Sequence, residues 1–304
     1  MSQIPHIINI ADFSKKQLED LSILASRIQE NSQLYADYLK GKILATLFFE
    51  PSTRTRLSFE SAMLRLGGKI MSVENASSSS VSKGERLEDM GRMLSCYADV
   101  VVLRHSEEDS INRFSKVSDI PVINAGNGSH EHPTQALLDY HTICAKKGRL
   151  DHLHIGFVGD LKHGRTVHSL VTLLRHFPVT FYFIANSELQ IPQSVLDAFS
   201  HHPESKFHFC SDLSIIDDLD VLYVTRLQVE RLKDHEKAYL ISQQFCITPK
   251  VIKNAKSNLI ILHPLPRVSE LDIAVDEDER ACYFLQAKYG VYVRMALLIS
   301  LLNF

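Results

Sequence analysis

The sequence lacks the short motifs that mark several large classes of enzyme. No GxGxxG follows an apparent strand and no GxxxxGK[ST] occurs, which argues against a dinucleotide cofactor and against a P-loop nucleotidase. The GxSxG turn of the α/β-hydrolases is missing as well. HExxH is absent and the 15 histidines are scattered, so the sequence predicts no metal site.

Cysteine, net charge and long apolar runs are also limited. The 5 cysteines lie far apart and form no CxxC pair, which favours free thiols in a reducing compartment over disulfides or a zinc site. A net charge of -3 argues against a broad nucleic-acid-binding surface. Apolar runs such as residues 43–49 are too short to cross a bilayer, and residues 1–12 do not resemble a signal peptide. We therefore expect a cytoplasmic protein that binds neither nucleic acid nor membrane.

What the sequence does contain is an alternation of apolar strands and helices. Its 304 residues, 45% hydrophobic and 23% charged, suffice for two ordinary globular domains. Ser14 and Gln17 form a capping-box pattern at the first helix. Further helices are predicted at residues 53–66, 87–97, 133–147, 166–176, 194–201 and 293–302. Strands are predicted at residues 42–49, 69–73, 100–103, 121–125, 152–158, 179–185, 207–210, 221–225 and 259–262.

This βαβ pattern occurs twice along the chain. It predicts an α/β protein of two doubly wound parallel-sheet domains, with the active site in the cleft between them. We place the domain boundary near Pro133, at the start of a long helix. The first domain then comprises residues 1–133, rejoined by the C-terminal helix at residues 291–304. The second comprises residues 134–290.

In the first half, residues suited to anions follow the apparent strands, where ligands bind in open α/β sheets. Ser52, Thr53, Arg54 and Thr55 open a helix directly after an apolar strand. The free N–H groups and the dipole of a helix start favour an anion there. Ser52 could instead be a plain helix cap, with the nearby arginines as solvated charges.

Two further strand ends in this half carry polar groups. Arg104 ends a buried strand, where a guanidinium is costly without a partner. His132 and Gln135 follow a glycine-containing turn and should face the crevice from the first turn of the next helix. His132 taken alone could equally be a structural histidine. Together with the preceding cluster, these groups predict a phosphate site.

The second half shows a different pattern of charge. Arg165 and Thr166 follow one predicted strand, and Arg226 and Gln228 follow another. His-Pro-Leu-Pro-Arg at residues 263–267 follows a third. Two separated arginines suit a dicarboxylate, because each guanidinium can bind one carboxylate through two parallel hydrogen bonds.

These segments resemble the transcarbamylase family. Residues 48–60, Phe-Phe-Glu-Pro-Ser-Thr-Arg-Thr-Arg-Leu-Ser-Phe-Glu, resemble its carbamoyl-phosphate signature, and His-Pro-Thr-Gln at residues 132–135 resembles its second shared motif. Two features favour the aspartate branch. The segment at residues 263–267 stands where the ornithine enzymes carry His-Cys-Leu-Pro, and Lys-Gly-Glu at residues 83–85 is typical of the aspartate enzymes. The resemblance runs from about residue 5 to the C-terminus.

The resemblance implies a reaction without cofactor or metal. A carbamoyl group passes from carbamoyl phosphate to the amine of L-aspartate, giving N-carbamoyl-L-aspartate and phosphate, an early step of de novo pyrimidine (UMP) biosynthesis. It also implies a homotrimer with shared active sites, to which regulatory or dihydroorotase-like chains bind in some members. The alternatives are a transcarbamylase for another amine, such as ornithine, and a non-catalytic binding homologue. Arg165 and Arg226 argue against a cationic acceptor side chain, and the intact motifs argue against a non-catalytic chain.

The resemblance further implies a role for individual residues. The phosphate is held by Ser52, Thr53, Arg54 and Thr55. The carbamoyl oxygen contacts Thr55, Arg104 and His132, which with Arg54 are the catalytic residues, and the carbamoyl amide contacts Gln135 and the carbonyls of Pro264 and Leu265. The aspartate site comprises Arg165, Thr166, Arg226, Gln228 and Lys83.

The resemblance also implies residues that act across subunits or domains. Lys83 and Ser80 reach in from the neighbouring subunit, although Ser79 is an alternative for Ser80. Glu50, Arg165 and Arg231 resemble the charge set that steadies the closed form of the family's enzymes.

Overall fold

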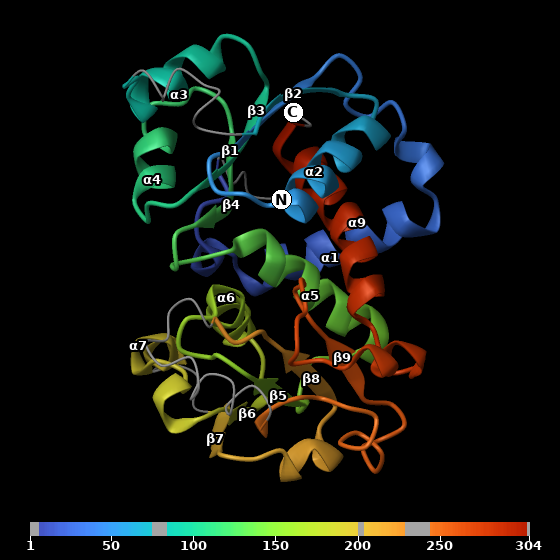
Figure 1. Cartoon of the computed structure of the whole chain (residues 1–304). Helices are drawn as coiled ribbons and strands as arrows, with labels where there is room; N and C mark the ends of the chain where they lie inside the picture. Colours follow the sequence, from blue (N-terminus) through green and yellow to red (C-terminus); the bar gives the residue numbers. More distant parts are fainter. Residues whose placement is uncertain (1–5, 75–83, 200–203, 229–243, 303–304) are drawn as a thin grey trace. The chain divides into compact units, whose positions relative to one another are not determined.

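The computed structural model describes residues 6–74, 84–199, 204–228 and 244–302 (Figure 1). The chain divides into two compact units. Unit 1 comprises Met1–His141 and Lys288–Phe304, and unit 2 comprises Thr142–Ala287. The predicted domain boundaries lie after residues 133 and 290. The two units divide between residues 141 and 142, within α5 (Pro133–Lys147), and between residues 287 and 288, within α9 (Tyr283–Leu302).

Unit 1 is built on a parallel sheet with the strand order β2-β1-β3-β4. β1 and β3 are neighbours although β2 lies between them in sequence, so the chain reverses direction across the sheet at this pair. Such a switch point is where open α/β sheets bind ligands. The strands are β1 (Ile43–Phe48), β2 (Lys69–Val73), β3 (Val100–His105) and β4 (Val122–Asn127).

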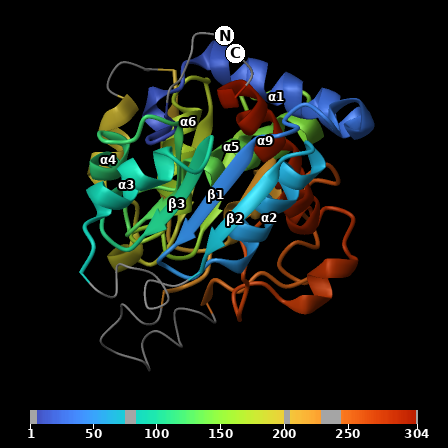
Figure 2. The same ribbon diagram turned by 90° about the horizontal axis from the view of Figure 1, so that it is seen from above.

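Helices cover both faces of this sheet. Figures 1 and 2 show α3 and α4 on one face and α2 and α9 on the other. Leu47 and Leu103 of the strands pack with Met90 of α3 and Phe114 of α4. The helices are α1 (Lys15–Glu30), α2 (Thr53–Arg65), α3 (Leu87–Ser95), α4 (Ser110–Ser115) and the short 3-10 helices η1 (Ile10–Asp12) and η2 (Ser32–Tyr35).

The predicted capping box at α1 is confirmed. The Ser14 hydroxyl accepts from the Gln17 backbone N–H at 3.3 Å, and the Gln17 side chain accepts from the Ser14 N–H at 2.9 Å. Both bonds satisfy donors that a helix start leaves open. The short α4 was not predicted.

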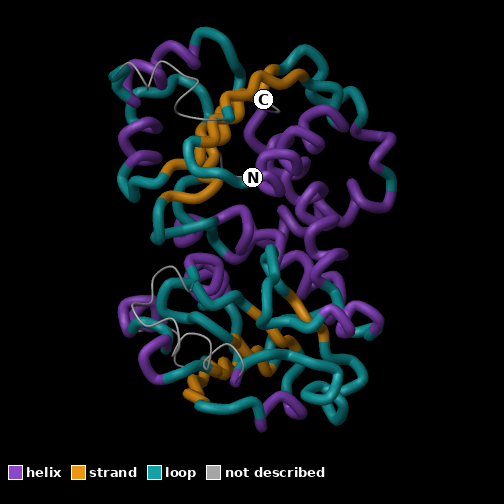
Figure 3. The backbone as a smooth tube through the Cα atoms, viewed as in Figure 1, coloured by secondary structure: helices purple, strands orange, loops and turns teal. Residues whose placement is uncertain are grey.

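Unit 2 contains a second parallel sheet, whose strands are among those coloured orange in Figure 3. Its strand order is β7-β6-β5-β8-β9. Its switch point lies between β5 and β8. The strands are β5 (His154–Val158), β6 (Thr180–Ile184), β7 (Lys206–Cys210), β8 (Val221–Val224) and β9 (Ile260–Leu262). The helices are α6 (Arg165–Leu174), α7 (Gln193–Leu196), η5 (Ser187–Leu189), η6 (Asp197–Phe199), η7 (Ser214–Asp218) and η9 (Ile273–Glu277).

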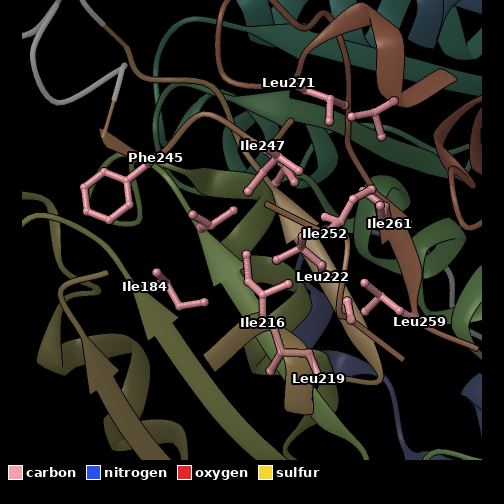
Figure 4. Close-up of a cluster of buried hydrophobic side chains, with 14 of the residues drawn as sticks. Ile184, Ile216, Leu219, Leu222, Phe245, Ile247, Ile252, Leu259, Ile261 and Leu271 are labelled. Carbon is pink, nitrogen blue, oxygen red and sulfur yellow. The ribbon is translucent and has the colours of Figure 1, made fainter. Parts of the chain in front are cut away.

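One face of the second sheet supports a buried apolar cluster (Figure 4). Ile184, Leu222 and Ile261 contribute from three strands, and Leu219 and Ile252 pack on them from connecting segments. Burial of this kind stabilises the unit by about 25 cal/mol per Å² of apolar surface. It also holds the strand ends in place, where the polar residues lie.

The prediction for the last helix was too short. α9 begins at Tyr283, ten residues before the predicted start at residue 293. Gly290 lowers the helix propensity of this segment, which hid its first half. The glycine permits close packing of α5 on α9, because a Cβ there would lie 2.6 Å from Arg294 Nη1 and 3.0 Å from Leu138 Cδ2.

The length and hydropathy of α9 also correct the prediction that the apolar runs are too short to cross a bilayer. Among the described helices, α9 alone is long and apolar enough to cross a membrane by these two criteria. However, 61% of that stretch is buried inside the protein, and a buried core helix meets the same criteria.

Candidate active site

The start of α2 retains the anion-binding features that the sequence predicted. Ser52 occupies the N-cap position, but its side chain makes no capping hydrogen bond. Thr53 and Arg54 are exposed, whereas Thr55 is buried. Partial desolvation lowers the pKa of Arg54 from its ordinary value. Because Ser52 does not cap the helix, its first N–H groups are not occupied by that hydroxyl and can serve an anion.

Arg104 is buried at the end of β3 and has partners, as its position required. Its Nη2 donates to Glu50 Oε1, and its Nη1 donates to the Ala125 carbonyl at 3.2 Å. Phe49 N–H donates to the Arg104 carbonyl at 2.9 Å, which joins the ends of β1 and β3. A buried guanidinium held in this way is preorganised to donate toward a ligand.

Glu50 was expected to act with Arg165 and Arg231. Within unit 1 it pairs with Arg104, a partner that the sequence analysis did not assign to it. Arg231 lies outside the described residues. The pairing depends on the strand register, which places Phe48 opposite Arg104 in neighbouring strands.

His132 is buried immediately before α5, and its carbonyl accepts from Gln135 N–H at 3.0 Å. The preceding turn is held by Asn127, which the sequence analysis missed. Asn127 Oδ1 accepts from Glu131 N–H at 3.2 Å, and its Nδ2 donates to the Glu108 carbonyl at 2.6 Å. A buried asparagine at a strand end was the available signal for this role, since such a group needs hydrogen-bond partners.

The sheet order brings these groups to one edge of unit 1. β3 lies between β1 and β4, so Arg104 stands between the turn that leads into α2 and the turn that leads to His132. The predicted phosphate and carbamoyl-oxygen contacts of this unit therefore share one edge of one sheet.

In unit 2, the carboxylate of Asp160 organises the turn after β5. Asp160 is fully buried, and its Oδ1 accepts from His163 N–H at 3.0 Å. Its Oδ2 lies 3.4 Å from Gln228 N, and Gln228 Nε2 donates to the His163 carbonyl at 2.8 Å. Asp160 was not among the predicted site residues, although its place after a strand and before a helix is visible in the sequence.

The arginines predicted to bind a dicarboxylate follow neighbouring strands of unit 2. Arg165 and Thr166 open α6, and Arg226 follows β8; all three are half-buried. β5 and β8 are paired with Val158 opposite Val224. This spacing places Arg165, Thr166, Arg226 and Gln228 at one edge of the sheet.

Gly159 makes the close approach of these two strand ends possible. Its φ is +120°, and a Cβ at this position would lie 2.1 Å from the Thr225 carbonyl oxygen. Only glycine fits this conformation and this space.

The segment after β9 is held by a buried histidine. His263 Nδ1 accepts from Leu265 N–H at 2.8 Å, so the ring proton belongs on Nε2, which donates to Glu270 at 2.8 Å. Although burial alone would raise it, the pKa of Glu270 is lowered because His263 and backbone N–H groups donate to its carboxylate. These bonds fix Pro264 and Leu265, both half-buried, whose carbonyls the resemblance assigns to the carbamoyl amide.

A second clamp holds the same segment further along. Arg267 pairs with Asp276 through both nitrogens, with Nη2 donating to Oδ2 at 2.6 Å. The Tyr283 hydroxyl also donates to Asp276. The Arg267 guanidinium holds the pKa of Asp276 below its ordinary value. Arg267 therefore shapes the segment.

Some predicted residues cannot be placed. Ser79, Ser80 and Lys83 lie outside the described residues. Within the described ranges, no group of three or more His, Cys, Asp or Glu side chains is arranged to hold a metal ion.

Comparison with known proteins bears on the meaning of these sites. Residues 5–145 match the model of the aspartate/ornithine carbamoyltransferase carbamoyl-P binding domain. Residues 151–301 match the model of the aspartate/ornithine carbamoyltransferase Asp/Orn binding domain.

The chain belongs to the aspartate/ornithine carbamoyltransferase family.

Its relatives within that family carry the names of the aspartate branch. The aspartate carbamoyltransferase catalytic subunit of Clostridium novyi is 46% identical over 100% of this chain and 99% of the relative. The corresponding subunit of Thermococcus gammatolerans is 48% identical over 96% of each chain. The family resemblance that the motifs predicted is confirmed.

Solved structures of the family agree with the fold. Aspartate transcarbamoylase from Trypanosoma cruzi in complex with N-(phosphonacetyl)-L-aspartic acid superposes with a TM-score of 0.94 at 40% identity, over 99% of this chain and 96% of that one. The catalytic subunit of M. jannaschii aspartate transcarbamoylase gives 0.93 at 45% identity, over 99% and 98%. The predicted fold class, with two parallel-sheet α/β domains, is thereby confirmed.

Proposed function

We propose that this chain transfers the carbamoyl group of carbamoyl phosphate to the amine of L-aspartate, giving N-carbamoyl-L-aspartate and phosphate. One observation carries the proposal: an anion-binding helix start in unit 1 and a pair of strand-end arginines in unit 2 occur in a chain whose full-length relatives are named aspartate carbamoyltransferases. The product is an early intermediate of de novo pyrimidine biosynthesis, so we also assign the chain to that pathway.

Unit 1 binds the donor in this proposal. The start of α2, from Ser52 to Thr55, holds the phosphate, because helix N–H groups and Arg54 together offer charge-assisted hydrogen bonds. Arg104 and His132 donate with Thr55 to the carbamoyl oxygen. The ion pair of the buried Arg104 with the half-buried Glu50 supports this assignment, since a guanidinium that is already oriented costs little to reorganise during the reaction.

The chemical step is direct attack on the carbonyl carbon. The amine nitrogen of aspartate forms a C–N bond, negative charge develops on the carbamoyl oxygen, and the C–O bond to phosphate then breaks. Donors directed at that oxygen stabilise the charge. Arg54 stabilises the charge that grows on the leaving phosphate, and the phosphate accepts the proton that the amine loses.

Unit 2 binds the acceptor. Arg165 and Arg226 each bind one carboxylate of aspartate, with Thr166 and Gln228 completing the contacts. The Asp160 network supports this role, because it holds Gln228 against the turn that precedes Arg165. An ornithine side chain would instead bring a cation toward guanidinium groups, which like charges disfavour.

We further propose a homotrimer in which Lys83 and Ser80, or Ser79 in place of Ser80, act in the site of a neighbouring subunit. Chains carrying Lys83→Ala and chains carrying Arg54→Ala should each be nearly inactive as pure assemblies. Mixed trimers should regain activity, because some sites then combine two intact contributions. The test is the activity of purified mixed trimers of verified composition, and no recovery would contradict shared sites.

A cytoplasmic location completes the proposal. All five cysteines are free, as is usual for proteins of reducing compartments. Binding of regulatory chains is compatible with the proposed activity and is tested by co-purification from the source cell.

The direct test is carbamoyl transfer by the purified chain, with aspartate and ornithine compared under the same conditions. We expect N-carbamoyl-L-aspartate and phosphate in equal amounts from aspartate, and no product from ornithine. Product from ornithine alone would assign the chain to the other branch of the family. No product from either amine would favour a non-catalytic binding chain.

A further inference from the structure

Gln135, which the family resemblance places against the carbamoyl amide, is oriented by another residue. Its Nε2 donates to Asp139 Oδ1 at 2.8 Å. Asp139 lies one helical turn further along α5 and is fully buried. An ionised carboxylate only accepts hydrogen bonds, so the amide nitrogen of Gln135 must face it. The carbonyl oxygen of Gln135 is thereby directed away from Asp139.

Arg294 of α9 supplies the positive charge that accompanies this buried carboxylate. Arg294 is 3% exposed, and its Nη1 donates to Ser58 Oγ at 3.0 Å. Its guanidinium also lies over the Phe59 ring, 5.0 Å from the centroid. Burial lowers the pKa of Arg294 to about 10, and the charge of Asp139 opposes that shift. Ser58 and Phe59 belong to α2, so Asp139 and Arg294 lie in the same interior as the phosphate-binding helix.

We infer that Asp139 determines which acyl phosphate the enzyme accepts, by holding the side-chain oxygen of Gln135 toward the substrate. This inference rests on the proposed function and on the contact between Gln135 and the donor that the family resemblance implies. An oxygen presented there accepts from the NH₂ group of carbamoyl phosphate, whereas the methyl group of acetyl phosphate leaves it unpaired. The two compounds differ only at this group, so Asp139 acts as a specificity-determining residue through Gln135.

The experiment compares carbamoyl phosphate with acetyl phosphate as donors to aspartate. For each protein, kcat/KM for carbamoyl phosphate is divided by kcat/KM for acetyl phosphate. The intrinsic difference in reactivity between the two compounds is the same for every variant, so it cancels when the ratios of two variants are compared. Asp139→Asn should lower this ratio by about tenfold or more. Asparagine can donate as well as accept, so the side-chain amide of Gln135 can flip and no longer presents its oxygen to the substrate. A purely structural role would reduce both activities together and leave the ratio unchanged, which would overturn the inference.

Two further variants guard against indirect effects. Asp139→Asn leaves the buried Arg294 without its opposing charge, so the paired variant Asp139→Asn with Arg294→Met removes both charges and should show the same fall in ratio. In a Gln135→Met background, Asp139→Asn should cause no additional fall, because the group that it orients is gone. An additional fall of similar size would place the effect elsewhere and overturn the inference.

Two control measurements separate the possible failures. Calorimetric affinity for inorganic phosphate should be the same in Asp139→Asn and in the unmodified chain if the start of α2 is intact. Absence of N-carbamoyl-L-aspartate from the unmodified chain would refute the proposed function and this inference together. An unchanged ratio in active variants would refute the inference alone.

Discussion

The two units use the same structural device for different purposes. In each, a carboxylate follows the central strand by two residues and reaches the neighbouring strand at the switch point. Glu50 in unit 1 meets the guanidinium of Arg104. Asp160 in unit 2 meets the backbone N–H groups of His163 and Gln228, together with Nδ1 of the neighbouring His163 ring. One carboxylate therefore orients a charged side chain, whereas the other shapes the loops that carry the arginines.

This difference matches the ligands that we assign to the units. A developing oxyanion is best stabilised by donors that are already fixed, and Arg104 is held rigidly in the interior. A dicarboxylate is bound by charge and by bidentate geometry, which half-buried arginines on a firm turn provide. The same sheet position can thus serve catalysis or binding, depending on what lies opposite the carboxylate.

The largest expected effect comes from removing the phosphate contact of unit 1. Arg54→Ala should reduce kcat by at least about 10²–10³-fold, because it removes the charge that stabilises the leaving group. The fold should survive, since the Arg54 side chain is exposed. Steady-state kinetics measure the loss of kcat, and thermal unfolding shows whether the fold survives. Arg56→Ala is the matched control, because Arg56 pairs with Glu74 at 2.5 Å and should affect turnover little. Near-normal activity of Arg54→Ala would refute the phosphate assignment.

A smaller effect is expected from replacing an arginine of unit 2. Arg226→Ala should reduce kcat/KM for aspartate by about 10–100-fold, which corresponds to a charged hydrogen bond of about 1.5–3 kcal/mol. The kcat/KM of Arg226→Lys should lie between those of Arg226→Ala and the unmodified chain, because lysine keeps the charge but loses the bidentate geometry. Titration with inorganic phosphate should show unchanged affinity in both variants. A parallel loss of phosphate affinity would mean that the two units do not divide the ligands as proposed.

A third test addresses the hydrogen bonds that hold the carbonyl groups of Pro264 and Leu265 in place. His263→Asn keeps an acceptor for Leu265 N–H near the position of Nδ1, whereas His263→Gln keeps only the donor toward Glu270. We expect the glutamine variant to raise KM for carbamoyl phosphate by roughly fivefold, the effect of one lost hydrogen bond, and the asparagine variant to raise it less. Initial rates at varied carbamoyl phosphate decide this. Equal effects in both variants would argue against a role for the Leu265 contact.

The smallest effect near neutral pH concerns stability. In unit 1, His141 is buried, with Nδ1 2.9 Å from Ser22 Oγ, and burial lowers its pKa to about 4 from 6.5. The unfolded chain takes up the proton below pH 6.5 and the folded chain does not, so stability falls as the pH drops. The loss is about 0.7 kcal/mol between pH 7 and 6 and approaches about 3 kcal/mol at pH 4.

Urea unfolding across this pH range measures the effect. His141→Asn, which keeps a polar partner for Ser22 but does not titrate, should show a flatter dependence. Identical slopes in the two proteins would exclude His141 as the cause.

Much of the fold was predictable because it is local in origin. The helix predicted at residues 133–147 and the strand at residues 69–73 occur with the predicted bounds. Helix capping at Ser14 depends on residues three apart, and strand periodicity depends on neighbours two apart, so both are visible in a short window. α9 was misjudged because a glycine that weakens a helix locally is there for packing against Leu138, about 150 residues away in the chain.

The sequence by itself determined which residues stand at the strand ends, and therefore the chemical character of each half: hydroxyls and arginines at a helix start for a phosphate, and separated arginines for a dicarboxylate. Only the tertiary structure decided the partners of these residues. Glu50 meets Arg104 because the sheet order places β1 beside β3, and Arg294 meets Ser58 because α9 packs on α2. Short-range patterns record turns and caps. Long-range pairings depend on strand order and helix packing, which no local window of sequence contains.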